Sequence, residues 1–371
     1  MPNSARILQF RASVAPATRS RDEAPTRAMA FLQSSAAARS EAFILEALSD
    51  ADVLSSLCST LAELINSTPA VVVDEAVGIY RWLSGRQPRE YFFDERDYYL
   101  GEFALLAGAS YRMAGRRDEA EIWFDRSDAN FRHTVAPAPH LARVAYNRLA
   151  LRYDGNRYED VVELLPSAAL TFERLGMRLE RAKCLLLEGL SLKQLGRLDE
   201  AAIRLRSLSE DQSIDTALRG TALVNLGNLL SMQGLYADAL STYQEAQPLL
   251  EAANRTSALA DLKLMFGETL RALGRLGDAI PAYRAAIEDL VGLGMATRAA
   301  YFRVALAELL IQANKPREAE WELLTALPTI DEQKMVPEGF AAVALLRESV
   351  RQRKTDPKAL LELREYLQAK S

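Results

Sequence analysis

The sequence is poor in the residues that hold metals and disulfides. It has two cysteines and two histidines among 371 residues. Cys58 and Cys184 lie far apart in apolar runs without a CxxC pair, which predicts two buried free thiols, as in a reducing compartment. His133 and His140 lie in a proline-containing connector, with no further ligand near them at metal-binding spacing. We therefore predict that both histidines are exposed in a loop and that the protein binds no metal.

Motifs of the common enzyme classes are also missing. The sequence contains no phosphate loop of the form GxxxxGK(S/T), no HExxH and no GxSxG. Its many carboxylates fall where helix ends and solvent-facing surfaces are expected, and solubility accounts for them there. An open array of helices also offers no closed, water-poor cleft for acid–base chemistry. The sequence thus predicts a protein that is not an enzyme and needs no cofactor.

Long apolar runs and long basic runs are both absent. No uninterrupted apolar stretch reaches the roughly 18 residues that a membrane-spanning helix needs. The net charge is -5, whereas binding to nucleic acid generally needs many phosphate contacts from lysine and arginine. We therefore predict a cytoplasmic protein without membrane or direct nucleic-acid contacts. Residues 1–38 are rich in arginine but lack the apolar core of a signal peptide, which predicts a disordered basic tail.

What the sequence does contain is an internal repeat. Glycines occur in pairs at a constant spacing, and an alanine follows the second glycine at a constant distance. The triplets are Gly108, Gly115 and Ala120; Gly189, Gly196 and Ala201; Gly227, Gly234 and Ala239; and Gly267, Gly274 and Ala279. The step from Ala120 to Ala201 is about twice as long as the next two steps, so it holds two periods, one of them degenerate. Asn314 and Ala319 continue the series at the same period.

These spacings have a structural explanation. A small residue in the middle of a helix allows a neighbouring helix to cross closely, and the second glycine ends that helix in a left-handed conformation. Acidic residues such as Asp238 and Asp278 then open the next helix, where its positive end favours them. The alanine one turn later lets the second helix pack on the first. Each repeat is thus predicted to be an antiparallel pair of helices.

The pattern resembles the tetratricopeptide repeat, which has small and aromatic residues at these spacings. The best repeat has the residues Gly227, Leu230, Gly234, Tyr236, Ala239, Tyr243 and Ala246. The resemblance implies an all-α fold, a right-handed superhelical solenoid of antiparallel helix pairs, over residues 98–330. Because the period is longer than the usual ~34 residues, the chain looks most like bacterial regulatory tetratricopeptide proteins with long repeats. These include the sensor halves of some transcription activators and signal-transduction ATPases.

Both ends of the chain are predicted to cap this array. Residues 39–97 have apolar residues at helical spacing and are predicted to form a degenerate helical cap, because terminal repeats are atypical. A three-helix DNA-binding head is the alternative there, although no polar recognition helix follows a tight turn. Residues 331–371 are predicted to form capping helices. Their last stretch, Pro357–Gln368, is amphipathic, and a homodimer through it is a possible arrangement.

Candidate binding residues follow from the repeat register. In a tetratricopeptide array, the first helix of each pair lines the concave surface. The predicted concave-face residues are Lys183, Lys193, Asn225, Asn228, Glu268, Arg271, Tyr301 and Glu308. Lysine, arginine and asparagine side chains can hold the backbone or the carboxylate of an extended peptide. The alternative is that these residues only form the solvated face of a scaffold.

The predicted function is a non-enzymatic adaptor or regulator that binds a protein or peptide segment in its concave groove. The carboxylate clamp of chaperone-binding repeats is incomplete here, because Asp261 and Leu264 stand where basic residues are expected. Two alternatives stay open. One is a small-molecule sensor, which needs an enclosed apolar pocket. The other is the detached regulatory half of a transcription regulator or a signal-transduction ATPase.

Overall fold

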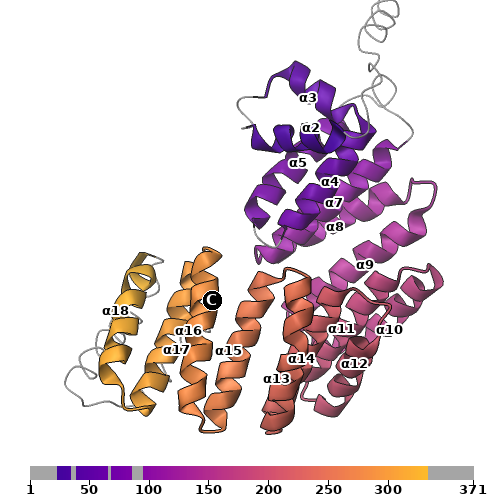
Figure 1. The fold of residues 1–371 in the computed structure, drawn as a ribbon. Helices are drawn as coiled ribbons and strands as arrows, with labels where there is room; N and C mark the ends of the chain where they lie inside the picture. The colour runs from indigo at the N-terminus through magenta and orange to yellow at the C-terminus, as the bar shows by residue number, and fades with distance from the viewer. Residues whose placement is uncertain (1–22, 35–38, 66–67, 86–94, 333–371) are drawn as a thin grey trace, which may run out of the picture. The chain divides into compact units, whose positions relative to one another are not determined.

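The computed structural model describes residues 23–34, 39–65, 68–85 and 95–332. These residues form 16 helices and no strand (Figure 1). The chain divides into two compact units, Met1–Cys184 and Leu185–Ser371, and the boundary falls inside one helix. The predicted all-α fold of sequentially packed helix pairs is therefore confirmed.

The first unit is organised around one buried helix. Its helices are α2 (Ala24–Gln33), α3 (Glu41–Leu48), α4 (Ala51–Leu64), α5 (Pro69–Gly85), α7 (Arg96–Met113), α8 (Arg117–Phe131), α9 (Pro137–Asp154), α10 (Tyr158–Arg174) and the first part of α11 (Arg178–Gln194). Helix α7 packs on α4, α5, α8 and α9, and every residue from Tyr99 to Gly108 is buried. A helix buried on all sides has no amphipathic stripe, in keeping with its nearly continuous run of apolar and small residues.

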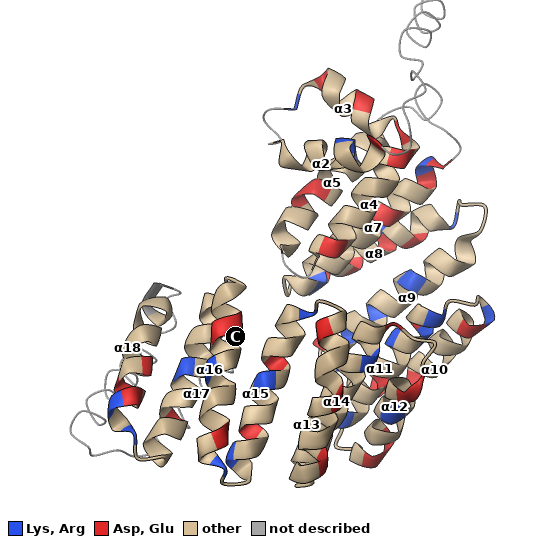
Figure 2. Cartoon of the chain, viewed as in Figure 1, with Lys and Arg blue, Asp and Glu red and all other residues tan. Residues whose placement is uncertain are grey.

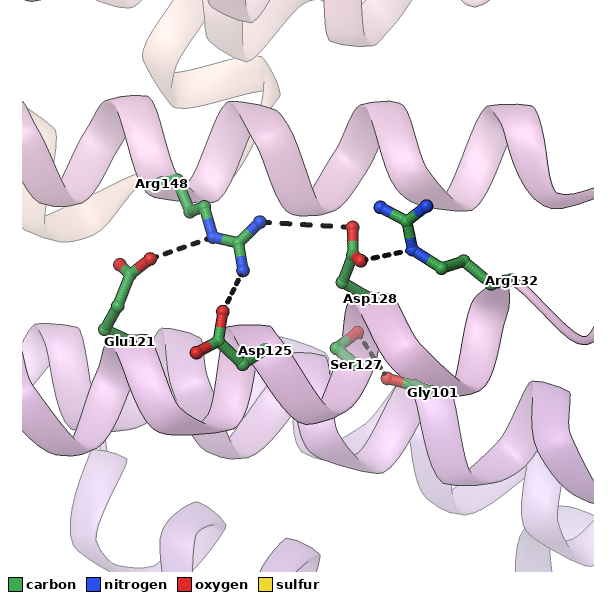
Figure 3. Close-up of polar contacts among 7 residues, drawn as sticks. All are labelled: Gly101, Glu121, Asp125, Ser127, Asp128, Arg132 and Arg148. Atoms are coloured by element: carbon green, nitrogen blue, oxygen red, sulfur yellow. Dashed lines mark hydrogen bonds and ion pairs between the residues drawn. The ribbon is translucent and has the colours of Figure 1, made fainter.

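Polar contacts orient the helices around α7. Arg148 of α9 pairs with three carboxylates of α8, those of Glu121, Asp125 and Asp128 (Figure 3). The hydroxyl of Ser127 on α8 donates a buried 2.8 Å hydrogen bond to the carbonyl oxygen of Gly101 on α7. Ion pairs with exposed partners contribute less than about 1 kcal/mol each. The ion pairs of Arg148 therefore contribute little to the stability of the unit.

The second unit repeats one pattern with little variation. After the rest of α11 come α12 (Leu198–Glu210), α13 (Thr216–Met232), α14 (Tyr236–Ala252), α15 (Thr256–Ala272), α16 (Leu276–Gly292), α17 (Ala296–Gln312) and α18 (Pro316–Glu332). From α13 onward each helix has 17 residues. The starts of these helices are evenly spaced, so that α13, α15 and α17 are equivalent, as are α14, α16 and α18. The predicted long period is therefore confirmed.

The glycines of the repeat have the two predicted roles. Gly234 follows α13 with a φ of 78°, in the left-handed region that glycine adopts without strain. A methyl group added to Gly227 would collide with the ring of Tyr243, and one added to Gly267 would lie 2.8 Å from the ring of Tyr283. Both rings are almost completely buried and come from the second helix of the same pair. The close neighbour that requires glycine is therefore an aromatic side chain of the paired helix.

One prediction for the N-terminal tail is wrong. Residues 24–33, expected to belong to a disordered segment, form helix α2. Its buried residues are Ala24, Ala28 and Phe31. Their spacing is helical, but the arginine content of the segment obscured it. Residues 1–22 and 35–38 of the predicted tail lie outside the described residues, as do residues 333–371 with the predicted closing helix.

Candidate functional site

The second unit contains a hollow of about 440 Å³ on three equivalent first helices, α13, α15 and α17. Its lining residues are Thr221, Val224, Asn225 and Asn228 from α13, Ala258, Asp261, Leu264 and Met265 from α15, and Arg298, Tyr301 and Phe302 from α17. Thr221, Asp261 and Tyr301 hold the same position in three successive repeats. The repeat thus places three distant stretches of sequence on one surface.

Two asparagines of α13 supply the polar side of the hollow. The amide nitrogen of Asn225 donates a 2.9 Å hydrogen bond to the carbonyl oxygen of Thr221, one turn earlier in the helix. The amide oxygen of Asn228 accepts a 2.7 Å hydrogen bond from the hydroxyl of Tyr243. These bonds assign opposite orientations to the two side-chain amides. These bonds use the NH₂ group of Asn225 and the oxygen of Asn228, so Asn225 presents an acceptor in the lining and Asn228 a donor.

The hydroxyl of Tyr243 remains a donor over the whole physiological range. Burial raises the pKa of Tyr243 to about 12, so the phenol stays protonated. Its ring is held against Gly227, which leaves no room for a side chain of its own. The packing of α13 against α14 therefore fixes the position of Tyr243, and Tyr243 in turn fixes the orientation of the Asn228 amide.

The opposite wall of the hollow is apolar. Leu264, Tyr301 and Phe302 are each at least nine-tenths buried, and all three line the hollow. At the rim, Arg298 of α17 forms an ion pair with Asp261 of α15, and both side chains stay partly exposed. The site thus combines fixed amide groups, an apolar wall and one neutralised pair of charges.

The predicted binding residues divide into two groups. Asn225, Asn228 and Tyr301 line the hollow as one set. Glu268, Arg271 and Glu308 lie outside this lining and pair with one another: Arg271 lies 2.8 Å from Glu268 and 3.4 Å from Glu308. Their role in binding stays a prediction. The side chain of Glu308 is only 4% exposed, and Tyr283 donates a hydrogen bond to Glu268. Of these contacts, the pair of Arg271 with Glu308 connects α15 to α17.

The two predicted lysines do not join the hollow. Lys183 belongs to the first unit, whereas the hollow lies in the second. Lys193 is half-buried near the end of α11, and burial lowers its pKa below the usual 10.5. Desolvation is the one cause of that shift, with no carboxylate acting against it. The place of both lysines in the predicted binding set stays a prediction.

Several lining residues were missed by reasoning from the sequence. They are Thr221, Val224, Ala258, Met265, Arg298 and Phe302. The signal that could have found some of them is the period itself, because stepping back from Tyr301 by one and two repeats leads to Asp261 and Thr221. Of the apolar wall, Tyr301 was predicted and Phe302 was not.

A second polar cluster lies in the first unit, around a histidine that was expected to be exposed. His133 is indeed exposed, but His140 lies in the first turn of α9 and is half-buried, so the prediction of a loop is wrong for it. Its ring stacks on Phe131 with 4.8 Å between centroids, and its Nδ1 lies 3.7 Å from the carboxylate of Glu102. Arg143 holds that carboxylate with contacts of 2.5 and 3.1 Å.

The described part of the chain shows neither a metal centre nor a membrane span. There, no group of three histidine, cysteine or acidic residues is placed to hold a metal ion. In the same residues, no helix has the length and apolar character to cross a membrane. Cys58 and Cys184 are both free thiols, with Cys184 buried and Cys58 half-buried.

Comparisons with known proteins find the same fold in solved structures. No family model matches the sequence, and no curated protein matches it. A Rap conjugation gene regulator of the plasmid pLS20, in complex with the Phr* peptide, is 17% identical with a TM-score of 0.53. The match covers 85% of this chain and 95% of that one. A Rap protein complexed with competence and sporulation factor is 12% identical with a TM-score of 0.52, over 92% of this chain and 99% of that one.

A third similar structure bears an enzyme name. Aspartyl phosphate phosphatase F from Bacillus subtilis is 13% identical with a TM-score of 0.50, over 90% of this chain and 95% of that one. Likeness at such low identity establishes the fold and nothing finer. The chain therefore has a helical array similar to the tetratricopeptide-repeat fold of Rap proteins, as the glycine and alanine pattern indicated.

Proposed function

We propose that this protein is a non-enzymatic adaptor or regulator that binds an extended protein or peptide segment in the hollow on α13, α15 and α17. The observation that carries the proposal is the pair of fixed amides at Asn225 and Asn228. One offers an acceptor and the other a donor, about one turn apart on the same helix. The backbone of an extended peptide presents matching N–H and C=O groups along one edge.

In this arrangement the ligand backbone lies along α13. A peptide N–H donates to the oxygen of Asn225, and a peptide C=O accepts from the NH₂ group of Asn228. The intervening side chain then packs on the apolar wall formed by Leu264 and Phe302. Each backbone hydrogen bond contributes about 0.5–1.5 kcal/mol, and burial of one leucine-sized side chain contributes about 1.5–3 kcal/mol.

Two of the similar structures are complexes by their own descriptions, one with the Phr* peptide and one with competence and sporulation factor. Their low identity supports the fold, and the step to this chain rests on its own residues. The open surface of the hollow, which is not a water-poor cleft, favours binding without chemistry.

The proposal can be tested without knowing the natural partner. A phage-displayed library of random peptides would be selected on the full-length protein, and the enriched peptides measured by calorimetry. We expect peptides with an apolar residue, and an affinity loss of about 30-fold in the Asn225→Ala, Asn228→Ala double variant, from two lost hydrogen bonds. Gln247→Ala on α14, whose side chain bonds to Glu251 of the same helix, is the matched control. Equal affinity of the double variant would refute the proposed site.

A small-molecule ligand is the second candidate, because 440 Å³ lies within the usual range of small-molecule pockets. It is favoured if no peptide is enriched on the wild type while a metabolite library raises its melting temperature. That rise should then disappear in the double asparagine variant and persist in Gln247→Ala.

A further inference from the structure

The charges in the lining of the hollow on α13, α15 and α17 are concentrated at its rim. Asp261 of α15 and Arg298 of α17 are the two lining residues that carry a charge, and they form an ion pair with each other. One guanidinium nitrogen of Arg298 donates to one carboxylate oxygen of Asp261. The side chain of Arg298 is 36% exposed and that of Asp261 is 42% exposed, so a ligand can reach both.

The preceding repeat does without this ion pair. The residues equivalent to Asp261 and Arg298 are Thr221 and Ala258, which also line the hollow and have no charge. Figure 2 shows both signs of charge on α15, whereas α13 has one charged residue, Arg219, which lies outside the lining. A partly exposed ion pair also contributes little to stability. The repeat therefore forms with or without charges at these two positions.

The ion pair leaves the lining without a free charge. A charged side chain that packs on the apolar wall loses hydration, which costs free energy unless an opposite charge compensates it. A ligand carboxylate at the rim is attracted by Arg298 but repelled by Asp261, and a ligand ammonium group meets the reverse. An uncharged segment avoids this cost, because the amides of Asn225 and Asn228 offer neutral hydrogen-bonding groups to its backbone.

From these observations we propose that the hollow selects a segment without charged side chains, and that Asp261 and Arg298 together determine this selectivity. The inference rests on the proposed function and names the class of segment that the same site takes, an apolar and uncharged one. Removal of either member of the pair leaves the other charge free. Asp261→Asn therefore selects acidic segments through Arg298, and Arg298→Met selects basic segments through Asp261.

The test uses a peptide selected from the random library on the full-length wild type. Each of its positions is replaced in turn by glutamine, glutamate and lysine, and calorimetry gives the dissociation constants. We expect one position at which the wild type binds the glutamate and lysine peptides more weakly than the glutamine peptide. At that position Asp261→Asn should bind the glutamate peptide about fivefold more tightly than the glutamine peptide, and Arg298→Met should do so for the lysine peptide, as for a strong exposed ion pair.

Two controls separate the ion pair from a general effect of charge. Glu251→Gln on α14 removes one negative charge, as Asp261→Asn does, but lies outside the hollow and should keep the wild-type preference. The double variant Asp261→Thr, Arg298→Ala has the residues of the preceding repeat and no free charge. It should disfavour glutamate and lysine as the wild type does.

The outcomes distinguish this inference from the proposed function. If the peptide loses affinity in the Asn225→Ala, Asn228→Ala double variant, but glutamine, glutamate and lysine rank alike in all other proteins, the site stands and the role of the ion pair is refuted. A wild type that prefers glutamate or lysine at the responsive position would overturn that role as well. If no peptide is enriched, or none depends on the two asparagines, the proposed function fails and this inference fails with it.

Discussion

The two units differ in the polar side chains that lie between the first helices of neighbouring repeats. In the first unit, Glu102 of α7 is 6% exposed and is held by two contacts from Arg143 of α9. In the second unit, the corresponding surface of α13 and α15 has a hollow with Asn225 and Asn228 beside it. A buried ion pair consumes its own hydrogen-bonding groups, whereas an asparagine with one internal bond keeps another for a ligand. The polar groups of the first surface are thus used up within the chain, whereas part of those of the second are not.

One register position shows the same contrast inside the second unit. Asn228, Glu268 and Glu308 are equivalent residues of three successive repeats. The asparagine faces the hollow, while the two glutamates share Arg271. This position therefore carries an amide where it lines the hollow and a carboxylate where it forms an ion pair with Arg271.

The largest expected effect comes from breaking the ion pair of Glu102 and Arg143 in the first unit. Arg143→Ala leaves the carboxylate of Glu102 buried without its partner. We expect a loss of about 3 kcal/mol in unfolding free energy, near the lower end for buried pairs because a third of Arg143 is exposed. Urea unfolding measures the loss, and hydrogen exchange of α7 and α9 locates it.

Two further variants show whether the loss comes from the uncompensated charge. Arg148→Ala removes ion pairs whose partners are mostly exposed and should cost less than about 1 kcal/mol. Adding Glu102→Leu to Arg143→Ala should restore most of the stability. If the double variant is as unstable as Arg143→Ala alone, the burial of an unpaired charge is not the cause.

The next effect concerns the packing beneath the hollow. Gly227→Ala places a methyl group against the ring of Tyr243, which is buried and cannot move without strain. We expect a loss of about 1–3 kcal/mol in thermal or urea unfolding. Gly277→Ala in α16 is the control, because a methyl group there meets no atom within 4 Å. Gly277 lies in the first turn of α16, where glycine costs less than in a helix interior, so this variant should be neutral or slightly stabilising.

A smaller effect is expected from the hydroxyl that orients Asn228. Tyr243→Phe keeps the ring but removes the donor, so the amide of Asn228 becomes free to turn over. We expect a loss of about 1 kcal/mol in peptide binding, or roughly fivefold in affinity, measured with a peptide selected on the wild type. Tyr236→Phe, on the same helix but outside the hollow, should bind as the wild type does. Unchanged affinity in Tyr243→Phe would show that the amide orientation is set by something else.

The features that could be predicted from the sequence are those with a local cause. The glycines and alanines of the repeat act on the backbone of their own helix pair, so the period and the turn at Gly234 were predicted from neighbouring residues. Three hollow residues, Asn225, Asn228 and Tyr301, were also found, because the repeat register places them on first helices.

The features that could not be predicted depend on side chains from different repeats. Arg271 pairs with Glu308, and nothing in the sequence shows that these two residues, one repeat apart, contact each other. The role of Glu268, Arg271 and Glu308 in binding stays a prediction. The place of Phe302 beside Tyr301 in the apolar wall depends on the packing of α17 against α15, which no residue of α17 shows by itself. The half-buried state of His140 likewise depends on Phe131 and Glu102, which come from other helices.

The smallest expected effect is a pH dependence of the unfolding free energy, caused by His140 beside Glu102 and Arg143. Burial lowers the pKa of His140 below its ordinary 6.5; the positive charge of Arg143 lowers it further, and the carboxylate of Glu102 opposes this. Tyr98 and Phe131 cover the ring. The unfolded chain thus takes up a proton at a higher pH than the folded chain. This contribution to stability is complete above the unfolded pKa and is lost as the pH falls through the folded pKa.

His140→Phe should therefore lose less stability than the wild type between about pH 7.5 and pH 5, whereas the exposed His133→Phe should follow the wild type. Urea unfolding at both pH values decides this, and parallel losses in all three proteins would mean that His140 is not desolvated by its neighbours.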